Sequence, residues 1–277
     1  MSDIIKIAAN VLKTEANELT RNAEILDGEF EKAVEVLYKT KGKVVVTGVG
    51  KSGHVGAKIA ATLASTGTPS FFMHPTEAMH GDLGMIGKDD TLLAISFSGE
   101  SEELTKILPH VQRFGVPIVA MARDKFSTLG KFSNAFVKLD VSKEACPLDA
   151  APTSSTTLTL ALGDALAVCL MRARDFQPED FAKFHPGGSL GRRLLCRVKD
   201  QMQTRLPIAT LTTSFTDCLT IMNEGRMGVA LVMEQQQLRG IITDGDIRRA
   251  LTANGANTLS KTAQELMTSH PKTIHQD

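Results

Sequence analysis

The sequence has no net charge and no cysteine framework. Its 277 residues include 31 lysines and arginines and 31 aspartates and glutamates, so no net field is available to hold a polyanion. Nucleic acid is therefore not expected as a partner. The four cysteines form no CxxC pair and have no histidine at zinc-finger spacing, which favours free thiols in a reducing cytosol.

Long apolar runs are also missing. No stretch near 20 residues is continuously apolar, since even the segment 158–171 contains Asp164, and a membrane span would need such a stretch. The N-terminal segment carries Asp3, Lys6 and Lys13 and so lacks the unbroken apolar region of a secretory signal. These absences predict a cytoplasmic protein with no membrane partner.

The composition is that of a globular protein with more than one core. Hydrophobic residues make up 42% of the chain and charged residues 22%, which is an ordinary balance. A length of 277 residues exceeds what one compact domain usually takes, because domains average about 150 residues. We therefore predict two domains.

Short apolar runs alternate with helical patterns through the first two-thirds of the chain. A helical pair is expected over about the first 40 residues. Five strand-like runs follow, at 43–47, 69–73, 92–97, 116–121 and 134–139. Strands that alternate with helices form a parallel sheet with helices on both faces. The predicted fold is α/β, with a doubly wound, five-stranded parallel sheet.

The first strand ends in a glycine loop, GVGKSG, at Gly48–Gly53. The loop satisfies GxGxxG, but a dinucleotide site would have an acidic residue about 20 positions later, where the chain has FMH at 72–74. A nucleotide-hydrolysing P-loop would need glycine where Val45 stands. We favour a smaller anion at the helix N-terminus, with Lys51 balancing its charge. The candidate contacts in this loop are Gly50, Ser52 and Gly53.

Hydroxyl groups cluster at two further helix starts. The turn after the third strand carries Ser96, Ser98 and Ser101 around Gly99, a set that suits one phosphate monoester. The alternative is that these serines only cap the helix. A Ser/Thr cluster at 154–157 precedes the apolar helix 158–171, and capping could account for it, with Ser154 and Thr156 as candidate contacts. That helix is apolar on nearly all sides, which predicts a buried position or a subunit interface.

Three motifs occur in order along the first 195 residues: GVGKSGHVG at 48–56, SFSGESEE at 96–103 and HPGGSLG at 185–191. Together they resemble the arabinose-5-phosphate isomerase family, in which a sugar isomerase (SIS) domain precedes cystathionine-β-synthase (CBS) domains. The resemblance implies interconversion of D-ribulose 5-phosphate and D-arabinose 5-phosphate, the first step of 3-deoxy-D-manno-octulosonate (KDO) synthesis for lipopolysaccharide or capsule. It also implies a homotetramer with sites between subunits. The expected partner is a small sugar phosphate, and no cofactor is expected.

The resemblance carries four functional positions onto Lys51, Glu103, Glu144 and His185. Aldose–ketose isomerisation moves a proton between C1 and C2 while the neighbouring oxygen gains charge. One of the two glutamates is the expected base, with a pKa raised by burial. His185 is the candidate for ring opening, and Lys51 is an electrostatic or phosphate-side group.

His80 lies in a loop, MHGDLG at 79–84, that the resemblance makes a wall of the active site. A structural, hydrogen-bonded histidine is the open alternative. If His80, His185 and Glu103 converge in space, His80 is a candidate ligand for inhibitory zinc, although their spacing demands no metal.

The sequence pattern changes beyond Arg193. There the segment 198–213 can be aligned with 262–277 as an internal repeat. The pattern between them, helix, two strands and helix, resembles a CBS domain, in which Gly240, Thr243 and Asp246 match positions that commonly hold an adenosine nucleotide. We predict a SIS domain at 1–195, a first CBS domain at 198–255 and the start of an incomplete second repeat at 262–277. Half a domain cannot bury its own core, so the nucleotide site stays a hypothesis.

Three alternative functions remain. SIS domains also serve transcription regulators as non-catalytic sugar-phosphate sensors, but the first 40 or so residues offer neither room nor a basic face for a helix-turn-helix. An isomerase of a heptose or hexose phosphate is disfavoured by the HPGG segment and the CBS tail. A nucleotide-responsive scaffold is the third alternative.

Overall fold

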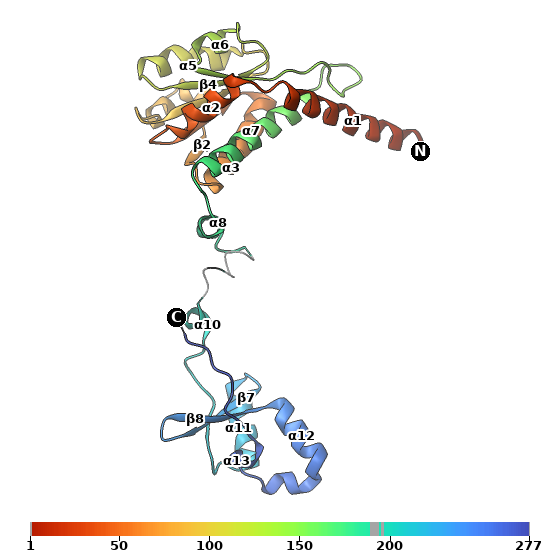
Figure 1. The fold of residues 1–277 in the computed structure, drawn as a ribbon, viewed down its shortest axis with the longest axis vertical. Helices are drawn as coiled ribbons and strands as arrows, with labels where there is room; N and C mark the ends of the chain where they lie inside the picture. Colours follow the sequence, from red (N-terminus) through yellow and green to blue (C-terminus); the bar gives the residue numbers. More distant parts are fainter. Residues whose placement is uncertain (1, 189–193, 195–196, 277) are drawn as a thin grey trace. The chain divides into compact units, whose positions relative to one another are not determined.

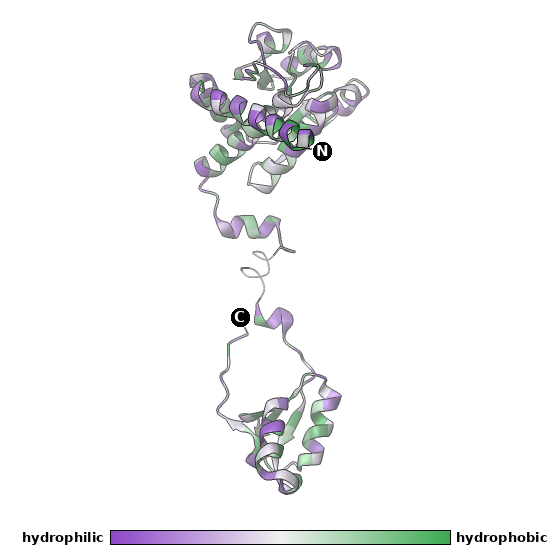
Figure 2. Ribbon diagram, turned by 90° about the vertical axis from the view of Figure 1, so that its right-hand side faces the viewer, coloured by the Kyte–Doolittle hydropathy of each residue, from purple (hydrophilic) through white to green (hydrophobic). Residues whose placement is uncertain are grey.

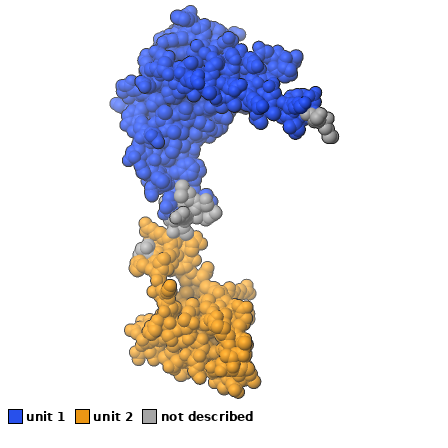
Figure 3. All heavy atoms as spheres, turned by 45° about the vertical axis from the view of Figure 1, so that its right-hand side comes forward, with its two compact units in different colours: residues 1–194 blue, residues 195–277 orange. Residues whose placement is uncertain are grey.

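The structure is a computed structural model that describes residues 2–188, 194 and 197–276. The chain divides into two compact units, residues 1–194 and 195–277 (Figure 3). The first unit carries the α/β sheet and the second a smaller mixed sheet (Figure 1).

The first unit is built on a five-stranded parallel sheet, which confirms the predicted fold class. Its strands are β1 (Val44–Gly48), β2 (Ser70–Phe72), β3 (Thr91–Ile95), β4 (Ile118–Ala122) and β5 (Ala135–Lys138), in the order β2-β1-β3-β4-β5. Every residue of β1, β3 and β4 is buried, as expected for strands covered on both faces. The neighbours of β1 in the sheet are β2 on one side and β3 on the other, so the strand order reverses between β1 and β3, where such sheets bind ligands.

Two layers of helices cover the sheet. One layer contains α1 (Ser2–Glu24), α2 (Gly28–Tyr38), α3 (Gly50–Ser65) and α7 (Ser154–Ala173); the other contains α4 (Pro75–Ala78), α5 (Glu102–Arg113) and α6 (Thr128–Phe132). Successive side chains of a strand point to opposite faces of the sheet, so each strand contributes to the core under both layers. Val44 and Val46 pack in the core with α2, α3 and α7, whereas Val45 packs in the core with α5. The described part of the unit also contains the short helices η1 (Asp82–Met85) and α8 (Pro178–Phe184).

The helix α7 is the core helix of this unit. Among the described helices it alone is long and apolar enough to cross a membrane by length and composition. Its buried side chains, however, pack in the core of the domain beside α3. The expected start at residue 158 is wrong: the helix begins at Ser154, so the Ser/Thr cluster lies inside its first turn.

The N-terminal helix α1 contributes little to the apolar core. Its buried face carries polar side chains, Thr14, Glu18 and Asn22. Its N-terminal half is exposed and of mixed polarity (Figure 2), with Ile4, Ile5, Ile7 and Leu12 open to solvent.

The second unit has the CBS order of elements and a four-stranded sheet, β6-β7-β8-β9. The order is α10 (Val198–Gln201), β6 (Ile208–Thr210), α11 (Phe215–Gly225), β7 (Val229–Glu234), β8 (Gln237–Thr243), α12 (Asp244–Asn254), η2 (Gly255–Ser260), α13 (Ala263–Leu266) and β9 (Thr268–Ser269). The two repeat segments each supply a short helix and a strand, and these strands add to opposite edges of the β7–β8 hairpin. Ala263 and Leu266 share one core with Phe215, so the start of the second repeat packs within this unit.

The close packing of α3 on α7 predicts a steric limit at Gly163. A Cβ at Gly163 would lie 2.4 Å from Cδ1 of Ile59, so Gly163→Val should lower the free energy of unfolding by about 1–3 kcal/mol. Urea unfolding measures this change. Gly28→Val is the matched control, because a Cβ at Gly28 meets no atom within 4 Å; equal stability of the two variants would contradict the proposed packing.

Candidate active site

A cavity of about 460 Å³ opens at the carboxyl ends of the strands in the first unit. It is lined by residues that directly follow β1, β3 and β4, by the segment after β5 and by the first turns of α7. The lining residues are Val49, Lys51, Ser52, Ser96, Phe97, Ser98, Ser101, Arg123, Val141, Ser142, Lys143, Glu144, Asp149, Ala150, Pro152, Ser155, Thr156 and Thr159.

The glycine loop brings Lys51 and Ser52 to this cavity in the first turn of α3. Gly50 has a φ of 58°, a left-handed conformation that suits glycine. A Cβ at Gly53 would lie 2.7 Å from the carbonyl oxygen of Gly48. Gly50 and Gly53 therefore shape the loop, and neither is among the residues that line the cavity.

The serine loop places three hydroxyls on the cavity wall. Ser96 is buried, and its Oγ lies 2.9 Å from Oγ of Ser101. Ser101 is the N-cap of α5 but makes no side-chain cap bond, so capping does not account for its hydroxyl. Ser98 accepts from the backbone N–H of Glu100 at 3.2 Å. Gly99 does not line the cavity; its φ is 71°, and a Cβ there would clash with Ser127.

The Glu144 carboxylate lies at the N-terminus of α7 and faces the same cavity. Its Oε2 accepts from the backbone N–H groups of Thr153 (2.7 Å) and Ser155 (3.2 Å) and from the Thr153 hydroxyl (2.9 Å). Burial raises the pKa of Glu144, but the hydrogen bonds from Ser155 and Thr153 outweigh it and leave the pKa lowered. The expectation of a base with a raised pKa is thus wrong for Glu144 in this conformation.

This capping carboxylate also explains the Ser/Thr cluster. Because Glu144 satisfies amides at the start of α7, the helix begins at Ser154 without a hydroxyl cap. Ser155, Thr156 and Thr159 lie on the face that lines the cavity. Ser154 does not: its side chain is buried and, among the described residues, its hydroxyl has no hydrogen-bond partner. The neighbour Ser155, rather than the expected Ser154, therefore lines the cavity.

Three residues expected at the site lie outside this cavity in the single chain. Glu103 is exposed in the first turn of α5, and His80 is exposed in the loop after α4. The ring of His185 stacks on that of Phe181 with centroids 3.9 Å apart, and Nδ1 of His185 lies 3.0 Å from the carbonyl oxygen of Phe181. His185 comes after the C-terminal end of α7, whereas the cavity lies at the N-terminal end of that helix. The two ends of a 20-residue helix are about 30 Å apart.

The convergence of His80, His185 and Glu103 on a zinc ion is not seen in this chain. In the ranges 2–188, 194 and 197–276, no group of three His, Cys, Asp or Glu side chains is placed to hold a metal. Residues 189–191 of the HPGGSLG segment lie outside the described residues.

Sequence reasoning missed several residues of the cavity wall. Arg123 directly follows β4, and its backbone N–H donates to the carbonyl oxygen of Phe97 at 2.9 Å, while its guanidinium lies over the Phe97 ring. The rule that ligands bind at carboxyl ends of parallel strands could have found Arg123. Lys143 and Asp149 come from the segment after β5, whose path no motif indicates. The wall thus combines three cations, Lys51, Arg123 and Lys143, with two carboxylates, Glu144 and Asp149.

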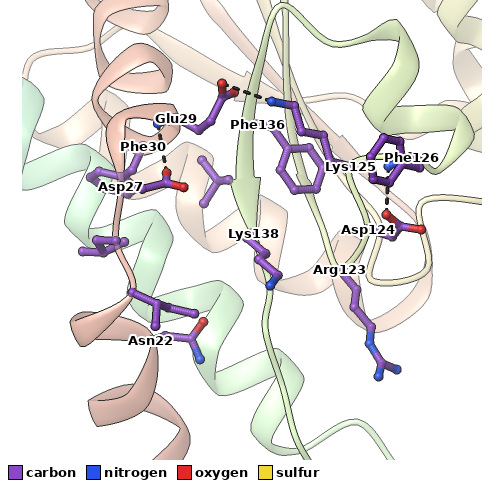
Figure 4. Close-up of a pocket in the computed structure, with 13 residues that line it drawn as sticks. Asn22, Asp27, Glu29, Phe30, Arg123, Asp124, Lys125, Phe126, Phe136 and Lys138 are labelled. Carbon is purple, nitrogen blue, oxygen red and sulfur yellow. Dashed lines mark hydrogen bonds and ion pairs between the residues drawn. The ribbon is translucent and has the colours of Figure 1, made fainter.

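A second cavity, of about 350 Å³, lies between the α1–α2 turn and the segment after β4. Figure 4 shows its aromatic and charged lining, including the ion pair of Lys125 with Glu29 at 3.1 Å. Arg123 lines both cavities, and none of the predicted site residues lines this one.

The three expected nucleotide contacts have structural roles in the second unit. Thr243 caps α12, and Oδ2 of Asp246 accepts from its backbone N–H (2.9 Å) and hydroxyl (2.6 Å). The other carboxylate oxygen of Asp246 accepts from Thr268 at 3.2 Å. A Cβ at Gly240 would lie 2.4 Å from the sulfur of Met267. These contacts join β8, α12 and β9, and nucleotide binding at these residues stays a prediction.

Comparisons with known proteins match both units. Residues 36–169 match the SIS domain and residues 197–253 the CBS domain. The probable arabinose 5-phosphate isomerase of Haemophilus influenzae is 59% identical over 273 residues, covering 99% of this chain and 81% of that protein. Arabinose 5-phosphate isomerase KdsD of Pseudomonas aeruginosa is 49% identical over 275 residues, covering 98% and 84%. A solved structure of an Escherichia coli protein in complex with arabinose 5-phosphate is 40% identical with a TM-score of 0.65, covering 67% of this chain and 98% of that one.

The bonds of Asp246 predict a pH-dependent contribution to the stability of the second unit. Burial raises its pKa, but the hydrogen bonds from Thr243 outweigh it and lower the pKa. Because the pKa is lower in the folded state, the ionised carboxylate stabilises the fold when the pH is above the ordinary carboxyl pKa. This stabilisation is lost as the pH falls through the folded-state pKa. Asp246→Asn should therefore lower the free energy of unfolding at pH 7 by about 1.5–3 kcal/mol. Urea unfolding at pH 7 and pH 4 should show a smaller difference at pH 4, and a difference that grows towards acid would refute this account.

Proposed function

Because this chain belongs to the arabinose 5-phosphate isomerase family, we propose that its cavity at the carboxyl ends of β1 and β3 interconverts D-arabinose 5-phosphate and D-ribulose 5-phosphate. The single observation that supports this assignment is the wall of the cavity, which combines serine and threonine hydroxyls and three cations with two carboxylates. The reaction would supply KDO synthesis in the cytoplasm.

The phosphate end of the substrate fits the serine loop. Ser96, Ser98 and Ser101 offer hydroxyl donors at the start of α5, and Ser52 offers another at the start of α3. Both helices present free amides and a positive dipole end there. Lys51 and Arg123 add charge-assisted contacts to a dianion. The phosphate would thus lie between the two loops where the strand order reverses.

The reacting carbons would lie toward Glu144. An ionised carboxylate can accept the proton from C2 of the open-chain aldose and return it to C1, while the hydroxyl proton on O2 moves to O1, giving the ketose. Lys51 and Lys143 can stabilise the oxygen that gains negative charge in the enediol-like intermediate. The lowered pKa of Glu144 keeps it ionised but limits its strength as a base, since base strength falls with pKa.

Glu103, His80 and His185 do not line this cavity in the single chain. We propose a homotetramer in which neighbouring chains bring these residues to the site, with Glu103 as the alternative base and His185 as the group for ring opening. The exposed apolar side chains of α1, Ile4, Ile5, Ile7 and Leu12, support association, because such a cluster is suited to an interface.

Loss of the Glu144 charge should abolish most turnover. Glu144→Gln keeps an oxygen acceptor for the α7 amides but cannot take a proton, so kcat/KM should fall by about 10² to 10⁴-fold. A colorimetric assay of ribulose 5-phosphate formed from D-arabinose 5-phosphate measures this, with Glu224→Gln in the second unit as control. An unchanged kcat/KM in Glu144→Gln would remove this residue from the reaction.

The same assay tests the substrate class. Heptose and hexose phosphates run in parallel should give no turnover. Binding of the pentose phosphate without turnover in the wild-type protein would instead favour the sugar-phosphate sensor.

Removal of the Arg123 charge should weaken substrate binding. Arg123→Met should raise KM for the sugar phosphate by about 10-fold or more, because a charge-assisted contact to phosphate is worth about 1.5–3 kcal/mol. Inorganic phosphate should become a correspondingly weaker competitive inhibitor. Arg113→Met, at the exposed end of α5, is the control; equal KM values for the two variants would show that Arg123 does not face the phosphate.

A further inference from the structure

The buried face of α1 is polar where a helix on a sheet is usually apolar. Thr14, Glu18 and Asn22 recur every four residues, and their exposed fractions are 7%, 4% and 3%. An ionised carboxylate in such a position is strongly unfavourable unless charged and hydrogen-bonding partners surround it. The partners of Glu18 therefore indicate what this face of the helix does.

Those partners belong to the segment that follows β5. Oε2 of Glu18 accepts from the backbone N–H of Ser142 at 3.2 Å, and Oε1 accepts from the Ser142 hydroxyl. Nη2 of Arg21 donates to the same Oε2 at 2.8 Å and to the carbonyl oxygen of Asp140, and Nη1 donates to Oδ2 of Asp140 at 3.0 Å. Asn22 donates to the carbonyl oxygen of Asp140 at 2.7 Å and accepts from its backbone N–H at 3.3 Å. Three side chains of α1 thus hold the backbone of two residues more than 100 positions away.

The bonds are strong enough to outweigh the burial of charge. Burial raises the pKa of Glu18, but the hydrogen bonds from Ser142 and Arg21 outweigh it and leave the pKa lowered. Burial also raises the pKa of Asp140, and there the bonds from Arg21 and Lys138 outweigh it and lower the pKa. Both carboxylates are therefore ionised at neutral pH, and the cluster of Glu18, Arg21 and Asp140 is fully formed there.

The held segment carries part of the active-site wall. Residues 141–144 all line the cavity, and Glu144 comes two positions after Ser142. Its carboxylate is fixed at the other side by the amides of Thr153 and Ser155. The helix α1 also reaches that side, because Glu15 accepts from the hydroxyl of Thr157 at 3.0 Å. One helix therefore fixes both the segment before Glu144 and the first turn of α7.

We propose that Glu18 is a positioning residue of the isomerase, which acts with Arg21 and Asn22 to hold residues 140–144 so that Glu144 meets the substrate. The proposal rests on the proposed function, since Glu144 must act on the substrate for its position to matter. Reaction rates are steep in this respect, because a misplacement of about 1 Å can cost about 10²-fold.

The test compares two identical substitutions on one helix in the full chain. Glu18→Gln removes the charge that pairs with Arg21, whereas Glu24→Gln changes an exposed residue of the same helix. Glu18→Gln should lower kcat by about 10- to 100-fold and leave KM within about twofold. Glu24→Gln should match the wild-type protein in both.

The pH profile separates positioning from a general loss of stability. When residues 140–144 loosen, Glu144 loses donors that lower its pKa, so the acid limb of kcat/KM should move to higher pH in Glu18→Gln. The other charged groups that share the cavity, Lys51, Arg123, Lys143 and Asp149, are unchanged in this variant. A limb that stays in place, with kcat equal to that of Glu24→Gln, overturns the proposal.

Hydrogen exchange keeps this test independent of the activity assay. Amides at 140–155 should exchange faster in Glu18→Gln than in Glu24→Gln, and unaltered exchange would overturn the positioning role whatever the protein catalyses. Absence of pentose-phosphate turnover in the wild-type protein would refute the proposed function, while faster exchange at 140–155 would still support the hold of α1 on this segment.

A milder variant serves if Glu18→Gln does not fold. Ser142→Ala removes the hydroxyl that donates to Oε1 of Glu18 and leaves the ion pair of Glu18 with Arg21 in place. It should give a smaller fall in kcat with the same direction of shift in the acid limb. Where both variants fold, the double variant should lose less than the product of the two single losses, because the two side chains share one interaction; multiplicative losses would contradict that coupling.

Discussion

The cavity proposed as the active site depends on the reversal of strand order between β1 and β3. Because β2 and β3 lie on opposite sides of β1, the helices that follow β1 and β3 leave to opposite faces of the sheet. The crossover rule for parallel strands enforces this divergence. The N-termini of α3 and α5 then flank one crevice, and the hydroxyls and amides of both loops face it. Two helix N-termini that can bind an anion thus meet at this edge because of topology, before any side chain is chosen.

Topology does not supply the carboxylate, which comes from the far end of the sheet. After β5 the chain must return across the edge to begin α7, and residues 140–153 make this return with no helix or strand of their own. Such a segment has many accessible conformations. The structure restricts it with charge rather than apolar packing: Glu18 and Arg21 hold it on one side, and the amides of α7 hold Glu144 on the other. Charged bonds are directional, so they fix a position more closely than apolar contacts do.

The sequence predicts the sheet well because its signals are local. Each of the five strands is a short apolar run beside a turn, and the glycine and serine loops follow directly from β1 and β3. Glu144 and Arg123 differ in this respect: the resemblance identifies Glu144, whereas Arg123 needs the strand order. The start of α7 was misplaced because its cap is a carboxylate nine positions before Thr153, and capping rules search for it next to the helix. The cluster around Glu18 joins residues more than 100 positions apart, which no local pattern reports.

The bonds that hold Glu144 also oppose the role of base proposed for it. Each donor to its carboxylate lowers the pKa, and a less basic carboxylate takes a proton from carbon less readily. The same donors remove the freedom of the side chain before substrate binds, and that saving can exceed the loss in base strength because orientation contributes more to rate than proton affinity does. The dipole of α7 further lowers the pKa of Glu144, and the rigidity of the helix further restricts its side chain. A carboxylate that caps a core helix and also lines the cavity is thus held precisely, but it is a weaker base. In the proposed reaction, the cations Lys51 and Lys143 would offset this loss of basicity by stabilising the charge that develops on the substrate oxygen.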